Sequence, residues 1–175
     1  QSQPTFDSNG SLSPFTYTFK RETKIGTETL PLDGSGNPVN GGTGLIRSAF
    51  RPSDDSNIYQ LFVPANAQML CQLRKIGSSL PKEMGKRALV ILNGIESGLQ
   101  THAIINHPIF GKVYAYEIDG FGGQNIMDDA NIPSLLSLPD FGYGTIHDEI
   151  YQNTRKMVLS KKGNPYYLQG EHFSG

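Results

Sequence analysis

The sequence has almost no cysteine and no tryptophan. A single cysteine, Cys71, occurs among 175 residues, so no disulfide framework can form within the chain. Cysteine and histidine residues do not recur at the spacings of zinc ligands, which argues against a metal site built from soft ligands. Cys71 follows Met69 and Leu70 in an apolar stretch, and this setting predicts a buried structural thiol rather than a nucleophile.

Excess charge and long apolar runs are also missing. The 15 basic and 16 acidic residues leave a formal net charge of -1, so there is no surplus to attract phosphates or anionic lipids. No apolar run approaches the roughly 20 residues of a membrane-spanning helix, and residues 1–14 lack the basic start and apolar centre of a signal peptide. We therefore expect a soluble chain without nucleic-acid or membrane partners, in a compartment that the sequence does not specify.

Glycine and proline are abundant instead, with 20 and 11 residues, and they concentrate in loops. Residues 33–44 (DGSGNPVNGGTG) are dominated by turn-forming residues and predict a surface loop. Before it, residues 15–22 (FTYTFKRE) alternate aromatic and polar side chains, which favours a half-buried strand. Residues 112–118 (KVYAYEI) favour a second β segment.

Helical periodicity is strongest in the middle of the chain. A first helix is predicted to start at Pro64 and to end near Gly77, and a second is predicted over residues 82–104. The apolar face of the first helix is expected to comprise Ala65, Met69, Leu73 and Ile76. The short link between the helices indicates an antiparallel hairpin, the unit of helical bundles and helical barrels. A short helix near Pro133 and a last one over residues 146–159 complete a mainly α prediction.

Two aspartate pairs share one construction. Asp54-Asp55 and Asp128-Asp129 each precede an apolar residue and a proline that favour a helix start. One interpretation is helix capping and loop order, because aspartate accepts hydrogen bonds from the unpaired N–H groups of a helix start. The other is glycoside hydrolysis, in which a protonated carboxyl group donates to the leaving oxygen and an ionised one activates water or attacks the sugar. Spacing alone leaves both interpretations open.

Neighbouring residues add further hypotheses. A calcium site formed by residues 127–131 (MDDAN) with Glu117 and Asp119 would supply hard oxygen ligands, although the spacing matches no EF-hand loop. Arg51 can hold a carboxylate or a sugar hydroxyl through its planar group, or form a salt bridge with the adjacent aspartates. Three aromatic residues nearby either stack on a sugar or pack in the core: Tyr114, Tyr116 and Phe121.

The most specific sequence lies in two long stretches. They are GLIRSAFRPSDDSNIYQLFVPANAQML, residues 44–70, and YAYEIDGFGGQNIMDDANIPSLLSLPDFGY, residues 114–143. Both resemble glycoside hydrolase family 125, the metal-independent exo-α-1,6-mannosidases. The resemblance extends to FKRET at residues 19–23 and to the closing GEHFSG at residues 170–175, so it covers nearly all of the chain beyond the first dozen residues.

This resemblance implies an (α/α)6 barrel, an inverting mechanism without metal or other cofactor, and release of non-reducing terminal mannose from α-1,6-linked mannosides. It implies that the general acid is an aspartate of the RPSDD motif, Asp55 or Asp54, of which Asp55 is preferred. The residues expected to hold the sugar at the scissile bond are Arg51, Asp128, Asp129 and Asn131. The expected ligand is a mannose-containing oligosaccharide or an N-glycan fragment.

The chain departs from the family in length and in its catalytic base. Catalytic domains of the family are more than twice as long, and their base is a glutamate in a later motif that the surroundings of Glu171 do not match. We therefore interpret residues 1–175 as a partial catalytic domain of about two or three helical hairpins, with a short β segment in its loops. The remainder of that domain is then a partner. The alternative from a different class is a mannoside-binding or structural module without turnover.

Overall fold

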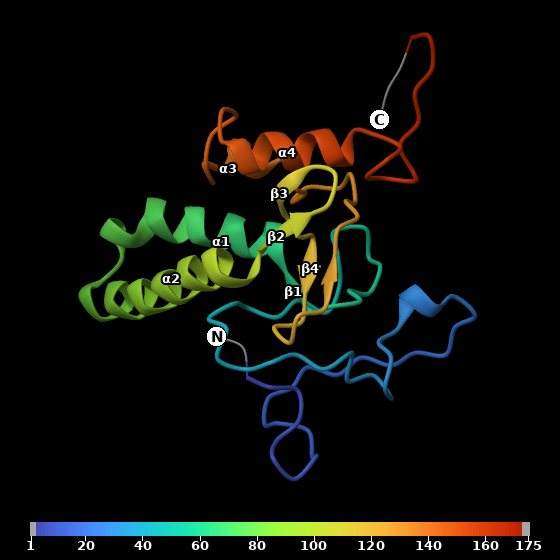
Figure 1. Cartoon of the computed structure of the whole chain (residues 1–175). Coiled ribbons are helices and arrows are strands. Elements are labelled where there is room, and N and C mark those ends of the chain that lie inside the picture. Colours follow the sequence, from blue (N-terminus) through green and yellow to red (C-terminus); the bar gives the residue numbers. More distant parts are fainter. Residues whose placement is uncertain (1–2, 173–175) are drawn as a thin grey trace.

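The protein is mainly helical, with short strands and long loops between them (Figure 1). The computed structural model describes residues 3–172, so the last three residues of the GEHFSG motif lie outside the described part. The helices and strands are, in chain order, β1 (Leu61–Phe62), α1 (Val63–Ile76), α2 (Lys82–His102), β2 (Ile104–His107), β3 (Gly111–Tyr114), β4 (Glu117–Ile118), β5 (Gln124–Asn125), α3 (Leu138–Phe141) and α4 (Glu149–Val158). Short 3-10 turns cover Gly26–Glu28 and Gly77–Ser79.

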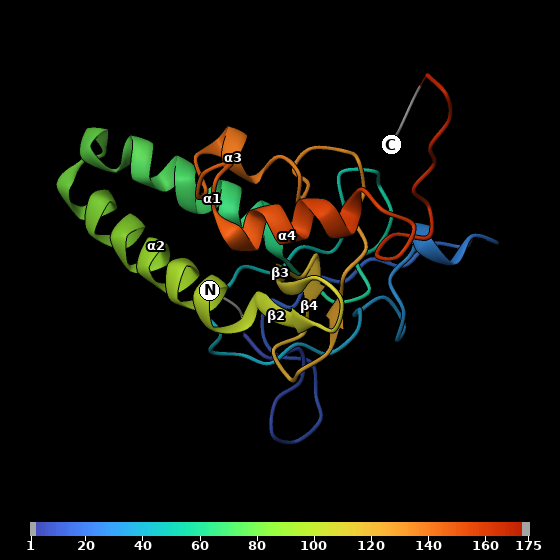
Figure 2. The same cartoon turned by 45° about the horizontal axis from the view of Figure 1, so that its top comes forward.

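The helices α1 and α2 form the predicted hairpin, and they lie side by side in both cartoon views (Figure 1 and Figure 2). Helix α1 begins one residue before Pro64, whose fixed φ suits the first helical turn. Arg74 and Lys75 occupy its last turn, where they suit the negative end of the helix dipole. An exposed ion pair joins the two helices, because Arg74 Nη2 lies 2.5 Å from Glu96 Oε1.

The buried face of α1 differs from the predicted one. Met69 and Ile76 of the predicted face are exposed, whereas Leu70 is fully buried. The reason is Asn66, a buried residue whose side-chain oxygen accepts Ile46 N at 2.8 Å and whose side-chain nitrogen donates to Ile46 O at 2.9 Å. This pairing turns a polar residue toward the interior and sets the rotation of the helix, so apolar periodicity alone misjudges its orientation.

A three-stranded antiparallel sheet brings distant segments together. Strand β4 lies between β1 and β5, with Leu61 opposite Ile118 and Glu117 opposite Asn125. The first aspartate pair shortly precedes β1, and the second shortly follows β5. The sheet therefore holds both acidic segments in one region of the fold.

The strand predicted over residues 112–118 is in fact two strands in two different sheets. Strand β3 pairs with β2 in a hairpin that the sequence did not predict, whereas β4 joins the three-stranded sheet. Between them, Ala115 N donates to Ala103 O at 2.8 Å and Tyr116 N donates to Asn125 O at 2.7 Å. The chain thus changes hydrogen-bonding partner within two residues, a change that depends on tertiary contacts rather than on the local pattern.

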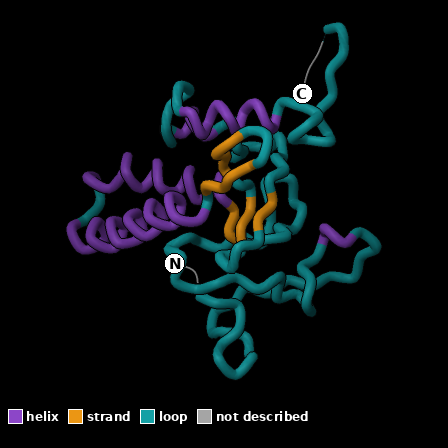
Figure 3. The backbone as a smooth tube through the Cα atoms, viewed as in Figure 1, coloured by secondary structure: helices purple, strands orange, loops and turns teal. Residues whose placement is uncertain are grey.

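The strand expected over residues 15–22 does not form. Phe19 N donates to Gly34 O at 2.8 Å and Leu30 N donates to Phe19 O at 3.2 Å, but residues 15–22 contain no strand. Residues 33–44 form a loop as predicted, within the long N-terminal loop region shown in teal in Figure 3. The N-terminal part is therefore organised by turns and isolated hydrogen bonds instead of by a ladder.

The two C-terminal helices begin later than predicted. Instead of a helix near Pro133, the chain makes a turn in which Ser134 N donates to Ser137 Oγ at 2.8 Å, and α3 follows that turn. Helix α4 packs against β3, where Thr154 Oγ1 accepts Tyr114 N at 2.9 Å. This contact satisfies a backbone N–H group of β3 that has no strand partner on that side.

The main core lies between the helical hairpin and the sheets. Its buried residues come from all four α-helices and from β1, β3 and β4, and include Leu70, Ile95, Leu99, Val113, Ile118 and Leu138. Cys71 is buried, as predicted. Along residues 3–172, no helix combines the length and the apolar character needed to cross a lipid bilayer.

Glycine permits the loop before the hairpin to pack directly on α2. A Cβ atom at Gly98 would lie 2.4 Å from Thr43 O and 2.9 Å from the side chain of Leu45. A side chain at this position is therefore incompatible with the close approach of the loop. Gly85 of the same helix has ordinary space, since the nearest neighbour of its Cβ would lie 3.6 Å away.

We expect Gly98→Ala to lower the free energy of unfolding by roughly 1–3 kcal/mol, because the methyl group overlaps a backbone oxygen. Gly85→Ala is the matched control and should raise stability by up to about 1 kcal/mol, the difference in helix propensity. Chemical denaturation of the three proteins measures both effects. Equal stability of Gly98→Ala and the wild type would show that the loop does not pack on α2 in this way.

Candidate active site

The RPSDD loop (residues 51–55) is a closed turn before β1. Arg51 N donates to Asp55 O at 2.8 Å and Asp54 N donates to Arg51 O at 3.1 Å, while a bridge between Phe50 and Ser56 closes the loop. Asp54 has a left-handed backbone with a φ of 68°, which aspartate tolerates better than most residues and which recurs at functional sites. Asp54 is exposed and Asp55 is half-buried, so the two carboxylates have different surroundings.

A serine hydroxyl joins this loop to the second aspartate pair. Ser53 Oγ donates a short hydrogen bond to Asp129 Oδ2 and lies 3.4 Å from Asp55 Oδ2. The linked residues Ser53 and Asp129 are 76 positions apart in the sequence. The two aspartate pairs therefore converge, and Asp55, Ser53 and Asp129 form one polar cluster.

Arg51 is anchored by a buried ion pair with Glu117. Arg51 Nε lies 3.4 Å from Glu117 Oε1, and the side chains are only 7% and 0% exposed. The other carboxylate oxygen accepts Ile58 N at 3.1 Å, Tyr59 N at 3.2 Å and Asn125 Nδ2 at 3.3 Å. Burial raises the pKa of the Glu117 carboxyl, and the Tyr59 N–H group, the Arg51 charge and the Asn125 amide oppose that rise. Glu117 therefore holds both ends of the segment that leads from the RPSDD loop into β1.

Arg51 thus pairs with Glu117, and not with the adjacent aspartates that one interpretation of the sequence named. The other contacts of the guanidinium group are also internal, since Nη1 lies 3.6 Å from Met127 Sδ and Nη2 donates to Ser56 O at 3.4 Å. Sequence reasoning considered Glu117 only as a calcium ligand. The signal that it missed is a lone acidic residue inside a β-prone, apolar run, because such residues are buried only when paired.

The MDDAN segment (residues 127–131) uses its carboxylates to order a loop. Asp128 Oδ1 accepts Leu135 N at 2.9 Å, and Asp129 Oδ1 accepts the backbone N and side-chain Nδ2 of Asn131 at 3.0 and 2.8 Å. Helices α1 and α3 both begin without a side-chain capping bond. The interpretation as helix caps is therefore wrong for α1 and α3, whereas the loop order proposed with it is confirmed for Asp128 and Asp129.

The two MDDAN carboxyl groups differ in acidity. Burial raises the pKa of Asp128 to about 7, although backbone N–H groups, chiefly that of Leu135, act in the opposite direction. Partial burial also acts to raise the pKa of Asp129, but hydrogen bonds from Ser53 and Asn131 outweigh it and hold this pKa below its usual range. The segment thus combines a carboxyl group that is neutral below about pH 7 with a neighbouring carboxylate.

The three aromatic residues Tyr114, Tyr116 and Phe121 do not form a common stacking platform. Tyr116 is fully buried, and its hydroxyl has no hydrogen-bond partner among residues 3–172. The ring of Tyr114 packs edge-on against that of Tyr143, with centroids 5.8 Å apart. Phe121 alone of the three is exposed. Packing in the core, the alternative that the sequence left open, therefore describes Tyr116.

The acidic residues near MDDAN do not assemble into a calcium site. Glu117 is engaged by Arg51 and by N–H groups. Asp119 Oδ1 accepts Phe121 N at 2.7 Å and Gly123 N at 2.8 Å, which closes the turn before β5. Within the described part of the chain, no group of three or more His, Cys, Asp or Glu residues is arranged to hold a metal ion.

A hollow beside the RPSDD loop was not foreseen from the sequence. Its volume is about 470 Å³, and it is lined by Tyr17, Phe19, Arg21, Glu28, Phe50 and Asp54. The alternation of aromatic and polar residues at 15–22 was interpreted as a strand pattern. In the structure it instead places two of its rings, Tyr17 and Phe19, on the wall of this hollow.

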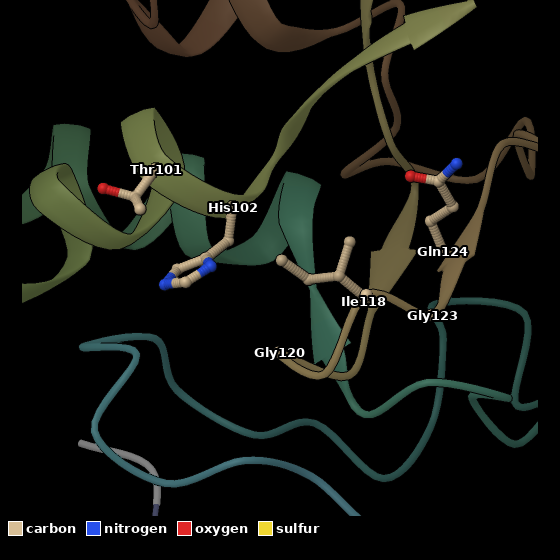
Figure 4. Close-up of a pocket in the computed structure, with 7 residues that line it drawn as sticks. Thr101, His102, Ile118, Gly120, Gly123 and Gln124 are labelled. Carbon is tan, nitrogen blue, oxygen red and sulfur yellow. The ribbon is translucent and has the colours of Figure 1, made fainter.

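A second, smaller hollow of about 200 Å³ lies where α2 ends (Figure 4). His102 from the end of α2 and Ile118 from β4 border it, together with Gly120 and Gly123 of the turn before β5. No residue of the RPSDD loop or of the MDDAN segment lines it. This hollow is therefore separate from the cluster of carboxylates.

We expect Glu117→Gln to lower the free energy of unfolding by roughly 3–5 kcal/mol, because it removes the carboxylate that pairs with the buried Arg51 charge. Glutamine keeps an oxygen acceptor for the backbone N–H groups, so the loss reports on the charge. Glu96→Gln is the matched control, since it removes the exposed partner of Arg74 and should cost at most about 1 kcal/mol. Urea unfolding measures both, and a loss no larger than that of the control would contradict the role given to the buried pair.

Asp128 should make stability depend on pH. Its pKa is about 7 in the folded protein, against about 4 in an unfolded chain. The folded state binds more protons between these values, so stability falls as the pH rises from about 4 to about 7 and then levels off. Asp128→Asn keeps an oxygen acceptor for Leu135 N but has no group to titrate. The stability of this variant should therefore not show the decrease that Asp128 causes in the wild type. Urea unfolding of both proteins at about pH 4.5 and about pH 8 measures the difference, and identical pH dependence would contradict the prediction.

Comparison with known proteins places the chain in a family. The whole chain, residues 1–175, matches the family described as metal-independent alpha-mannosidase (GH125). A curated relative, the meiotically up-regulated gene 157 protein of Schizosaccharomyces pombe, is 52% identical over 180 residues, which cover 100% of this chain and 35% of the relative. The chain thus spans about a third of that protein.

A solved structure agrees with this match. The Streptococcus pneumoniae metal-independent alpha mannosidase, in a non-productive substrate complex with alpha-1,6-mannobiose, superposes with a TM-score of 0.85 at 39% sequence identity. The match covers 93% of this chain and 39% of the pneumococcal chain. Sequence and structure therefore agree, and the chain belongs to the metal-independent α-mannosidase family GH125.

Proposed function

We propose that the protein carrying this chain is an inverting exo-α-1,6-mannosidase that releases terminal mannose from α-1,6-linked mannosides. The observation that carries the proposal is the convergence of Asp55 and Asp129 on the Ser53 hydroxyl. The complex of the pneumococcal relative with alpha-1,6-mannobiose supports this class of substrate. In the same proposal, α1 and α2 form one hairpin of an (α/α)6 barrel, and other helices of that barrel lie outside residues 1–175.

Asp55 is proposed as the general acid. It donates its proton to the glycosidic oxygen while the bond between that oxygen and the anomeric carbon breaks. A glutamate outside residues 1–175 is proposed as the base, which takes a proton from the water that attacks the anomeric carbon from the opposite face. The two carboxyl groups would stand roughly 6.5–9.5 Å apart to admit this water, and β-mannose would be the first product.

Asp128, Asp129 and Asn131 are proposed to hold the sugar at the scissile bond. A carboxylate such as Asp129 accepts hydrogen bonds from hydroxyl groups, the Asn131 amide both donates and accepts, and a protonated Asp128 adds a donor. Arg51, which the sequence placed at the sugar, is proposed to act mainly through its ion pair with Glu117. That pair keeps the RPSDD loop, and with it Asp55, in position against the sheet.

Hydrolysis of α-1,6-mannobiose by the natural protein that contains this chain tests the proposal. Proton NMR should show β-mannose as the first product of the wild type. Asp55→Asn should lower kcat by roughly 10²–10⁴-fold, the usual contribution of a general acid. The same variant should lose far less activity on 2,4-dinitrophenyl α-mannoside, because that leaving group departs without a proton. Asp54→Asn is the matched control and should retain most of its activity on both substrates.

Other outcomes have equally definite meanings. Loss of turnover in Asp54→Asn, with full activity in Asp55→Asn, would reverse the assignment of the acid. Appearance of α-mannose first would contradict inversion. Binding of α-1,6-mannobiose by a well-folded wild type that does not hydrolyse it would support a mannoside-binding module in place of an enzyme.

A further inference from the structure

An aromatic trough extends from the RPSDD loop along the N-terminal segment. It consists of two adjoining hollows of about 470 and 370 Å³ that share Tyr17 and Phe50 as walls. Asp54 lines the first hollow and Arg47 lines the second. Hollows of this size are typical of sites for small molecules, and the roles proposed above for the carboxylates make no use of either one.

The aromatic walls of the trough are both rigid and accessible. The rings of Phe19 and Phe50 meet edge to face, with centroids 5.3 Å apart and an angle of 88° between their planes. This contact fixes the wall that Phe50 contributes to both hollows. Tyr17 is 57% exposed, so its ring is open to a ligand. The apolar C–H face of a pyranose ring packs well on such a surface.

The polar groups of the trough are held in place and balanced in charge. At the first hollow, Arg21 Nη2 lies 2.6 Å from Glu28 Oε2, and Thr23 Oγ1 donates to the same oxygen at 2.6 Å. At the second, Arg47 Nε donates to Gln60 Oε1 at 3.1 Å. Fixed donors and acceptors side by side suit the neighbouring hydroxyl groups of a neutral sugar. An anionic ligand would require an excess of positive charge that these walls do not provide.

The RPSDD loop contributes both a wall residue of the trough, Asp54, and the proposed acid, Asp55. Asp54, in its left-handed conformation, lines the first hollow, whereas Asp55 lies beside Ser53 and Asp129. The RPSDD loop is thus the junction between the trough, which Asp54 lines, and the proposed mannose-holding residues, of which Asp129 shares the Ser53 hydroxyl with Asp55. A general acid of a glycosidase acts at this junction, on the oxygen between the departing chain and the terminal sugar.

We propose that the trough binds the leaving-group side of an α-1,6-linked oligomannoside, with one sugar in each hollow. This inference rests on the proposed function, because it names the part of the substrate that lies beyond the scissile bond. It assigns Tyr17 and Phe50 as stacking surfaces and Arg21, Glu28 and Arg47 as partners of the sugar hydroxyls. The protein should therefore prefer longer oligomannosides to mannobiose.

Three variants of the natural protein test the trough. Tyr17→Ala removes the shared wall, Tyr17→Phe keeps the ring, and Tyr166→Ala removes a tyrosine that is 76% exposed and lies outside both hollows. Tyr17→Ala should lower kcat/KM for α-1,6-mannotetraose by roughly 10-fold or more, equivalent to about 1.4 kcal/mol. It should leave hydrolysis of α-mannosyl fluoride unchanged, because fluoride occupies no part of the trough. The other two variants should behave as the wild type with both substrates.

Binding measured without turnover separates failure of the trough from failure of the proposed function. Calorimetric titration with thio-linked α-1,6-mannotetraose, which is not hydrolysed, should show about 10-fold weaker binding for Tyr17→Ala only. If the wild type binds the tetraose more tightly than Tyr17→Ala but hydrolyses no mannoside, the trough proposal stands and the enzyme proposal is overturned. Normal hydrolysis and binding in Tyr17→Ala, or no binding by the wild type, would overturn the trough.

Discussion

The buried contact between Arg51 and Glu117 is the interaction on which the rest of the site depends. One oxygen of the Glu117 carboxylate faces the arginine, and the other receives the N–H groups of Ile58 and Tyr59. A single side chain of β4 therefore holds the start and the end of the segment that carries the aspartate pair. Removing either charge would leave the other buried and unpaired, which typically costs several kcal/mol. A loop rich in turn residues is in this way attached firmly to the sheet.

The same constraint favours a preorganised site. The RPSDD loop and the MDDAN segment flank the strands β1 and β5, and Ser53 links their carboxylates directly. Burial then distinguishes two adjacent aspartates, because Asp128 is pushed toward its neutral form while Asp129 is stabilised as a carboxylate by hydrogen bonds. Groups of different protonation state held at fixed positions need little reorganisation during acid–base chemistry.

Local patterns predicted some elements of the fold and misjudged others for identifiable reasons. The helices α1 and α2 were predictable because helical periodicity and the proline at the start of α1 are local signals. The buried face of α1 was not, because Asn66 is turned inward by its pairing with the backbone of Ile46. The alternation at residues 15–22 suggested a strand, yet rings such as Tyr17 are exposed beside a hollow. An alternating pattern shows which side chains are apolar, but it does not show whether another segment packs over them.

The sequence by itself determined the helical hairpin, the turn-rich loops, the identity of the acidic motifs and the resemblance to the mannosidase family. Each of these features depends on residues that are close together along the chain. Only the tertiary structure decided the partners of the charged groups. In the folded protein Arg51 pairs with Glu117 and not with the adjacent aspartates, and Ser53 donates to Asp129. Asp54 lines a hollow, whereas Asp55 lies beside Ser53. Ion pairing and burial act between residues that are distant along the chain, and their proximity arises only when the sheet brings the segments together.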